Sequence, residues 1–484
     1  MKLIAPFLLS LFSITLSAQT TYALSLDDVV AAAQSSSPAA KLAETRLSNR
    51  YWFYQSTLAD FKPQIRFEGT LPLLNRSIEP ITLPNGEQQF VSRSFMRNEI
   101  GFSISQDIPL TGGTVFASTG LERLDVFRQG NVDGKTSYLS TPFSIGFRQS
   151  LTGYNELRWT KELAPLRYQE AELEYREDRE DLAYRAAQLF FGIFQAQLNL
   201  EAALIRQTNA DTLFAISTGR YSVGRIAETE LLQIELSALN ANTEVEQARI
   251  NLQGATEQLR NFLGITEAVV FDLVPPTELP AFSVNADTAL AYASANRSEI
   301  IGYKRRLLEV EREAAAAKAN TGITGDLFAN FRLSQTADNL GDAYTNPLDN
   351  EVLTLGISIP IADWGKSKAQ LEVARSNREL EQLNVAQERI SLEQEILLAV
   401  NQFELLRNNV ALAKRAYDVS EKALDITRKR YLIGKIGITE LNLAIQEQNK
   451  ARLLYIQALR SFWLAYYELR VNTLYDFRAG RGLR

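Results

Sequence analysis

The sequence matches itself when it is shifted by 210 residues. The segment Arg220–Leu231 recurs as Arg430–Leu441, with seven identical residues at matching positions. The match continues without a gap over roughly 120 residues of each half. A match of this length indicates a duplicated unit of fixed geometry, far longer than a solenoid repeat. We place the first repeat at 24–280 and the second at 281–484.

The composition excludes several classes of function. The chain of 484 residues contains no cysteine and no histidine. Disulfides, thiol catalysis, most catalytic triads and the usual zinc sites each need one of these residues. The formal net charge of −6 provides no basic surface for nucleic acid. We therefore expect a protein that is not an enzyme, that holds no cofactor or metal, and that does not bind nucleic acid.

The N-terminus is typical of a secretory signal. Lys2 precedes an apolar run at 3–16, which is too short to span a bilayer comfortably. We expect a signal peptide at 1–23, cleaved after Ala18 or Ala23; an uncleaved anchor is the alternative. No later segment reaches the roughly 20 apolar residues of a membrane helix. The exported chain could therefore enter a membrane only through barrel strands.

Proline breaks helices, so its absence marks where long helices can run. No proline lies between Pro165 and Pro275, and none follows Pro360. Each of these regions carries a heptad seam of apolar and small residues, then a turn with glycine, then a second seam. We expect two long helical hairpins, at 157–264 and 366–474. Shorter helices at about 27–60 and 287–319 would stack end to end on the return helices.

Between the helices the apolar pattern changes to a period of two. It does so at about 62–74 and 138–151 in the first half, and at about 324–335 and 351–361 in the second. Runs of about ten alternating residues fit transmembrane barrel strands, with apolar side chains toward lipid. A soluble sheet with one buried face is the alternative. We expect four strands per chain, which are too few to close a barrel alone.

The first half contains a segment, 75–137, that has no counterpart in the second half. It includes alternating residues around Phe102 and the turn Thr111-Gly112-Gly113. We interpret it as an inserted hairpin at the periphery, in the position of a surface loop. The alternative is that it adds two strands to the barrel.

In each half, the predicted elements therefore follow the order helix, strand, strand, long helix, glycine turn, return helix. In this order and spacing the chain resembles the TolC-like outer-membrane efflux proteins. The segment Leu24–Asp28, with Ser37-Pro38, is similar to the N-terminal signature of that family. The Tyr-x-x-Gly turns followed by Thr-Glu-Leu are similar to its hairpin tips. The resemblance covers nearly all of the exported chain.

The resemblance implies a mainly α fold with a β-barrel part, assembled as a homotrimeric α/β barrel of twelve strands. It implies a channel in the outer membrane of a Gram-negative bacterium, in contact with lipid and extending into the periplasm. Such a channel is the exit duct of a tripartite efflux pump or a type I secretion system. Its partners are a periplasmic adaptor and an inner-membrane transporter, and its cargo is drugs, metals or proteins. A structural or adhesive coiled-coil surface protein without a conducting lumen is the alternative.

The hairpin tips carry the candidate functional residues. In the family, a basic residue that ties the helices shut stands two positions after the glycine of the second tip; here Ile436 occupies that position, with Lys435 beside it. The acidic ring of the family falls one turn further on, where Glu440 stands. We expect the gate and lumen to involve Glu440, Glu230, Lys435 and Arg225. We expect the adaptor to contact Gly224, Gly434, Tyr221, Tyr431, Arg220 and Arg430.

Simpler roles compete with these expectations. Arg220 and Arg430 could compensate the dipoles of helix C-termini. Tyr221 and Tyr431 could complete the packing of the seam. The carboxylates could be solvated charges at the ends of helices.

Overall fold

A computed structural model gives the fold, and it describes residues 20–483 except 83, 128–133, 152, 268, 277–278, 434 and 437. The chain divides into two compact units, and each takes segments from both sequence halves. The first unit comprises Met1–Arg46, Leu173–Arg297 and Leu392–Arg484, and the second comprises Leu47–Glu172 and Ser298–Ser391. The boundary between the two sequence repeats stays a prediction.

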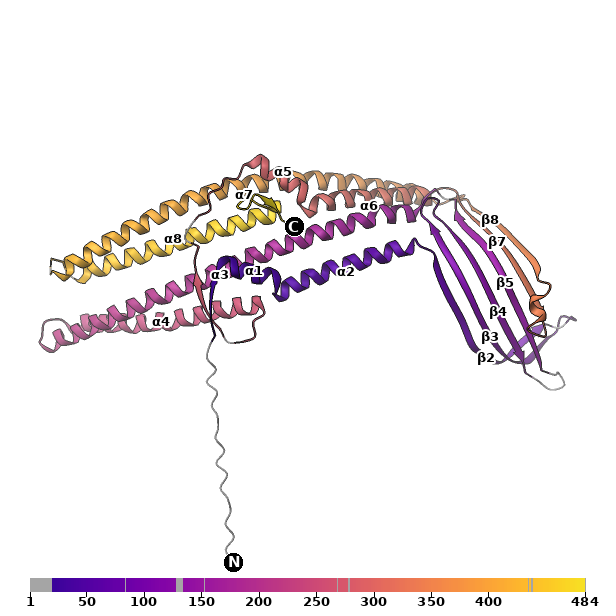
Figure 1. The fold of residues 1–484 in the computed structure, drawn as a ribbon, viewed down its shortest axis with the longest axis horizontal. Coiled ribbons are helices and arrows are strands. Elements are labelled where there is room, and N and C mark those ends of the chain that lie inside the picture. The colour runs from indigo at the N-terminus through magenta and orange to yellow at the C-terminus, as the bar shows by residue number, and fades with distance from the viewer. Residues whose placement is uncertain are drawn as a thin grey trace, which may run out of the picture. The chain divides into compact units, whose positions relative to one another are not determined.

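Two pairs of long helices dominate the chain (Figure 1). Helices α3 (Glu156–Ser222) and α7 (Lys366–Leu432) contain 67 residues each, and α4 (Glu228–Leu263) and α8 (Ile438–Thr473) contain 36 each. A helix of 67 residues measures about 100 Å. These helices occupy the two ranges in which the sequence predicts hairpins. None of the described helices has the length and hydropathy of a membrane span.

The heptad seams hold each hairpin together. In the first hairpin Ala203 of α3 packs with Val245 and Ala248 of α4, and all three are buried. In the second hairpin the rings of Phe403 and Phe462 lie 5.1 Å apart, and both are fully buried. Small side chains let one helix pair approach closely, whereas aromatic side chains fill the space in the other.

Four shorter helices lie in the two ranges where the sequence predicts helices, and a contact joins each range to the end of a return helix; their stacking along the full length stays a prediction. The four helices are α1 (Leu26–Ser35), α2 (Pro38–Asp60), α5 (Ala286–Asn296) and α6 (Ser298–Asn320). Gly264, at the C-terminus of α4, has φ +74°, and a Cβ there would lie 2.8 Å from Cδ of Pro38. At the matching joint, Asn296 donates a hydrogen bond of 3.1 Å to the carbonyl of Thr473.

The long strands form one antiparallel sheet in the second unit (Figure 1). The strands are β2 (Gln64–Thr82), β3 (Gln88–Ile108), β4 (Gly113–Val126), β5 (Lys135–Ser150), β7 (Thr324–Ala337) and β8 (Leu348–Ser358). Their order across the sheet is β2-β3-β4-β5-β7-β8. Four of them, β2, β5, β7 and β8, overlap the four expected strands. The expected number is nevertheless wrong, because the sheet contains six strands.

The segment 75–137 is not a peripheral hairpin. Its residues complete β2 and form β3 and β4, which lie between β2 and β5. The alternative reading, in which this segment adds two strands, is the one that the sheet supports. The ring of Phe116 on β4 lies over Gly146 of β5, and the absence of a side chain at Gly146 lets the two strands pack closely. A Cβ on Gly146 would come 2.5 Å from Cζ of that ring.

One face of the sheet is apolar across all six strands. Cross-strand neighbours on this face include Phe67 with Phe102, Ile145 with Phe331, and Leu327 with Leu355. Exposed members include Phe67, Phe102, Ile104, Ile145, Leu353 and Leu355. The opposite face is polar, and a hollow of about 550 Å³ over it is lined by residues of β2, β3, β4, β5 and β7. The period of two in the sequence therefore sorts apolar and polar side chains as expected.

A short parallel pair joins β1 (Thr20–Ser25) to β6 (Val269–Val274). Val269, Phe271 and Leu273 of β6 are buried. The expected signal peptide, 1–23, lies mostly outside the described residues. Cleavage after Ala18 would leave β1 whole, whereas cleavage after Ala23 would remove most of it. The remaining short elements are η1 (Asp342–Tyr344), between β7 and β8, and the antiparallel pair β9 (Tyr475–Asp476) and β10 (Arg481–Gly482).

A buried polar cluster fixes the end of α8 in the first unit. Nε of Arg470 donates to Glu180 of α3 at 2.8 Å, and Nη1 of Arg470 lies 3.5 Å from Asp476. The hydroxyl of Tyr466 donates to Asp476 at 2.7 Å. The side chains of Arg470 and Glu180 are 13% and 7% exposed. Although burial opposes its charge, these partners keep the pKa of Arg470 above its usual value.

Candidate functional site: the hairpin tips and the groove behind them

The first tip is a tight turn built around a left-handed glycine. Gly224 has φ +71°, and its amide donates to the carbonyl of Tyr221 at 2.8 Å. The amide of Arg225 donates to the carbonyl of Arg220, also at 2.8 Å. This pair of bonds is a Schellman motif, which satisfies two carbonyls that the end of α3 would otherwise leave unpaired. The turn therefore needs glycine for its backbone conformation.

The second tip keeps one of these hydrogen bonds 210 residues later. The amide of Lys435 donates to the carbonyl of Arg430 at 2.9 Å, which is the counterpart of the bond from Arg225 to Arg220. Gly434 lies outside the described residues, and its expected role stays a prediction. The duplicated sequence thus gives two tips with the same closing hydrogen bond.

The predicted charges of the tips are exposed. Arg220 and Arg225 flank the end of α3, and Glu230 lies in the first turn of α4. Glu440 lies in the first turn of α8. A carboxylate there also stabilises the positive end of the helix dipole, by typically 0.3–1 kcal/mol. Both carboxylates therefore act as favourable charges at the N-termini of the return helices.

The two tyrosines do not complete a buried seam. Tyr221 is 42% exposed and Tyr431 is 37% exposed, whereas their seam neighbour Ser217 is buried. The packing role considered from the sequence is therefore wrong within one chain. Both rings remain available to a partner at the end of each hairpin.

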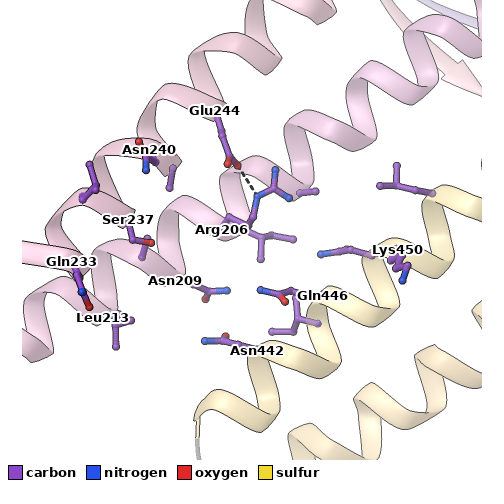
Figure 2. Close-up of a pocket in the computed structure, with 18 of the residues that line it drawn as sticks. Arg206, Asn209, Leu213, Gln233, Ser237, Asn240, Glu244, Asn442, Gln446 and Lys450 are labelled. Atoms are coloured by element: carbon purple, nitrogen blue, oxygen red, sulfur yellow. Dashed lines mark hydrogen bonds and ion pairs between the residues drawn. The ribbon is translucent and has the colours of Figure 1, made fainter. Parts of the chain in front are cut away.

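Behind the tips, a groove separates the first hairpin from α8 (Figure 2). Its volume is about 900 Å³, and α3, α4 and α8 all contribute to its lining. Asn209 of α3 faces Asn442 and Gln446 of α8 across the groove (Figure 2). On the wall formed by α3 and α4, Arg206 pairs with Glu244 at 2.9 Å. The groove is therefore rich in amides, unlike the apolar seams within each hairpin.

The contacts across this groove are sparse and polar. Oδ1 of Asn442 is buried and has no hydrogen-bond partner in the part of the chain that the structure describes. At the end of the groove away from the tips, Nη1 of Arg452 lies 2.9 Å from both carboxylate oxygens of Glu201. These side chains are 34% and 52% exposed, and an ion pair of this kind contributes at most about 1 kcal/mol. Along this groove, the contact between the two hairpins is therefore weaker than the packing within each hairpin.

Sequence reasoning missed this groove. Its signal is the difference between the repeats, because Asn442 and Asn449 of α8 occupy the positions of Leu232 and Leu239 in α4. Such a difference suggests two environments for equivalent faces. Within the described residues, no group of three or more acidic side chains is placed to hold a metal ion.

Comparisons with known proteins agree with the architecture. A family model described as outer membrane efflux protein matches residues 105–265 and 304–471, which together exceed half of the chain. A search among curated proteins finds no match. Among solved structures, the outer membrane channel CmeC of Campylobacter jejuni is 16% identical, with a TM-score of 0.61 and coverage of 95% of this chain and 86% of that one.

Two further channels show the same fold. The outer membrane protein VceC of Vibrio cholerae is 14% identical, with a TM-score of 0.58 and coverage of 95% and 97%. The open state of the MtrE outer membrane channel of Neisseria gonorrhoeae is 15% identical, with a TM-score of 0.54 and coverage of 95% and 90%. Paired helical hairpins, a two-faced sheet and a family model matching both halves lead to one conclusion: the chain belongs to the outer membrane efflux protein family, whose members are efflux channels of the outer membrane.

Proposed function

We propose that the protein is the exit duct of a tripartite efflux pump or a type I secretion system, and that it conducts cargo passively across the periplasm and the outer membrane. The observation that carries this proposal is the sheet, which is apolar on one exposed face and polar on the other. Lipid can cover the apolar face, and a water-filled lumen can face the polar one. Export then needs no chemistry from the channel itself.

The strand order supports closure of the sheet by further copies of the chain. Neighbouring strands are antiparallel throughout, so the edge strands β2 and β8 run in opposite directions. β8 of one copy can therefore pair antiparallel with β2 of the next, and the same contact repeats around a ring. An open edge is not tolerated in lipid, so the ring must close. The membership of the chain in the outer membrane efflux protein family supports three copies as the number in the ring.

The internal repeat supports a specific contact between the helices of neighbouring copies. Within one chain, the face of α3 that includes Ala202 and Asn209 meets Asn442 and Asn449 of α8 across the groove. The repeat maps this face of α3 onto an exposed stripe of α7, spaced by seven residues: Leu398, Leu405, Leu412, Val419 and Ile426. It maps the two asparagines of α8 onto Leu232 and Leu239 of α4, which are 55% and 58% exposed. We infer that α7 of one copy packs against α4 of the next.

The tips form the gate and the contact with a periplasmic adaptor, which connects the channel to an inner-membrane transporter. The exposed arginines, tyrosines and carboxylates of the two tips support this assignment. The polar groove also supports it, since weakly joined hairpins can part near their ends while each hairpin stays intact.

A bilayer experiment tests the proposal. We expect the purified protein to give discrete single-channel conductance steps in planar lipid bilayers. A surface protein made of coiled coils without a lumen would give none, and that result would replace the exit duct with the structural alternative. Loss of export from cells that lack the gene, restored by the wild-type chain, is the companion measurement.

A further inference from the structure

We propose that β3 and β4 cross the outer membrane together with the other four strands, so that three copies form a barrel of eighteen strands rather than twelve. This inference rests on the proposed function, and it extends that function to the width of the exit. The cargo that such an exit fits is large and hydrophilic, because barrels of 16–18 strands enclose an aqueous channel.

The inserted strands have the length that a membrane requires. β4 contains 14 residues and β3 contains 21, whereas a tilted transmembrane strand needs about 9–11. The shortest strand of the sheet, β8, contains 11. No strand of the six is therefore too short to span.

The inserted strands also continue both faces of the sheet without interruption. On the apolar face, Phe102 and Ile104 of β3 are 56% and 40% exposed and lie opposite Phe67 and Ile65 of β2. If β3 and β4 stood outside the membrane, this apolar surface would be left in water. A large exposed apolar face of this kind indicates contact with lipid or protein.

The polar face of the inserted strands leaves room in a lumen. Gly101 and Ser103 of β3 lie opposite Gly120 and Ser118 of β4. These small side chains line the hollow over the polar face. Further along the same strands, Arg97 and Glu122 form an ion pair of 2.8 Å, which neutralises charge on the wall. The added strands thus widen the ring without filling it.

The strands are held in the sheet from both sides. β4 pairs with β3 over Phe95–Ile108 and with β5 over Lys135–Arg148, and the single register shift lies between Ser118 and Gly120. If β3 and β4 left the sheet as a detached hairpin, the backbone edges of β2 and β5 that now pair with them would lose these partners. A sheet that separated into four spanning strands and a detached hairpin would lose both ladders.

Site-directed labelling tests the proposal, and the absence of native cysteine gives no background. The test pairs are Ser103→Cys with Ile104→Cys on β3, and Ser118→Cys with Ala117→Cys on β4. A reference pair is Thr354→Cys with Leu353→Cys on β8. The probe is a charged, membrane-impermeant maleimide added to the protein in lipid vesicles.

We expect the probe to label the polar-face cysteines on all three strands. The apolar-face cysteines should stay unlabelled, because lipid covers them. Equal labelling of both faces on β3 and β4, with alternation kept on β8, would overturn the eighteen-stranded barrel alone. Loss of alternation on β8 as well would instead remove the membrane-spanning sheet and, with it, the proposed function.

A deletion measures the width independently. Removal of 83–134 joins β2 to β5 and keeps the alternation of strand direction. Because barrel diameter grows roughly linearly with strand number, the cross-section should fall roughly twofold, from eighteen strands to twelve. We expect a smaller size limit for neutral polymers added from the outer side of a bilayer. An unchanged size limit in an inserted deletion variant would contradict the proposal, and a variant that does not insert leaves the decision to the labelling.

Discussion

At the scale of single residues, the buried cluster around Arg470 connects the two sequence halves. Arg470 belongs to the second repeat and Glu180 to the first, and their side chains meet at 2.8 Å away from solvent. Among the described residues of the first half, Arg260 occupies the equivalent position and is not part of such a cluster. Arg260 pairs instead with Glu257 on its own helix, at 2.5 Å. Equivalent residues therefore differ in burial and in partner.

This difference supplies a matched pair of variants. We expect Arg470→Met to lower the free energy of unfolding by about 3–5 kcal/mol, because Glu180 would remain as a buried charge without its partner. Arg260→Met should cost less than about 1 kcal/mol, since its ion pair lies within one helix and is more exposed. Unfolding in detergent, followed by tryptophan fluorescence, measures both. Equal losses would show that the cluster is not a special contact between the halves.

The same cluster predicts a dependence of stability on pH. Burial raises the pKa of Asp476, but hydrogen bonds from Tyr466 and the backbone, together with Arg470, more than offset it and hold this pKa below its usual value. A lowered pKa stabilises the fold above the unfolded value of about 3.9, and this stability is lost as pH falls through the folded value. Asp476→Asn should therefore destabilise the protein at neutral pH, and the difference should shrink as the pH falls below the unfolded pKa of about 3.9 and through the lower folded pKa. A constant difference across this range would contradict the charge-based explanation.

Glu440 provides a test of the gate. If three copies of this carboxylate ring the narrowest point, they concentrate cations there. We expect Glu440→Gln to weaken cation selectivity and block by multivalent cations in single-channel recordings, with assembly unchanged. Glu230→Gln is the comparison at the equivalent position of the first tip. Unchanged selectivity in the Glu440 variant would place this residue outside the lumen, as one of the helix-end charges.

At the scale of elements, the turn at Gly224 is where backbone conformation matters most. A Cβ would meet open space both at Gly224 and at Gly219, but only Gly224 has a positive φ. We expect Gly224→Leu to strain the turn by about 1–2 kcal/mol and to abolish export, with expression and trimer formation kept. Gly219→Leu lies in regular helix and should leave the turn intact. If both variants abolish export, the tip is sensitive to bulk rather than to the shape of the turn.

The sequence anticipates the long elements well and the sheet incompletely. Proline-free regions and heptad seams indicate the long helices, and the shift of 210 residues indicates that the two hairpins match. The predicted number of strands is wrong because β3 and β4 have no counterpart in the second half, and the prediction counted only the repeated strands. Alternation around Phe102 indicates a strand, but not which neighbour it pairs with. Pairing and register depend on contacts between distant segments such as Phe116 with Gly146, which no local pattern contains.

The turns at the tips can be predicted for the same reason as the long helices, because their sequence is repeated. The groove is not, because it depends on which equivalent faces meet inside the chain and which remain on its outside. Asn442 on an inner face and Leu232 on an outer face look like ordinary variation until the helices are placed side by side. Their difference becomes meaningful only in three dimensions.

At the scale of the whole molecule, the two kinds of contact between hairpins differ in strength. Near the tips, the contact within a chain is a polar groove, and the proposed contact between copies is a stripe of leucine, valine and isoleucine. Apolar burial stabilises the second kind, by about 1.5–3 kcal/mol for each fully buried side chain. A ring of such chains should open within each chain before its copies separate.

A variant at the apolar stripe tests this assembly. We expect Leu412→Gln to weaken the free energy of trimer association by roughly 2 kcal/mol per contact. Detergent-extracted trimers of the variant should therefore dissociate at a higher protein concentration than those of the wild type. Lys414→Gln is the control and should leave the trimer intact, because Lys414 is exposed on α7 but lies two residues from Leu412, away from the side that carries the stripe. Mass measurement of the purified complex over a dilution series checks both. A wild-type chain that is a stable monomer with its strands intact would refute the trimer altogether.

The unequal lengths of the strands have a consequence for the outer surface of a cell. β2 contains 19 residues and β8 contains 11, so their difference of 19 − 11 = 8 residues corresponds to about 27 Å of extended chain. In the proposed closed ring, the long strand β2 of one copy would lie beside the short strand β8 of the next. The outer edge of the barrel would therefore be uneven in height. If three copies close the proposed ring, the three hairpins of β2 and β3 would be the first parts that an antibody or a bacteriophage meets. The low stretches between them leave the mouth open for whatever the cell expels.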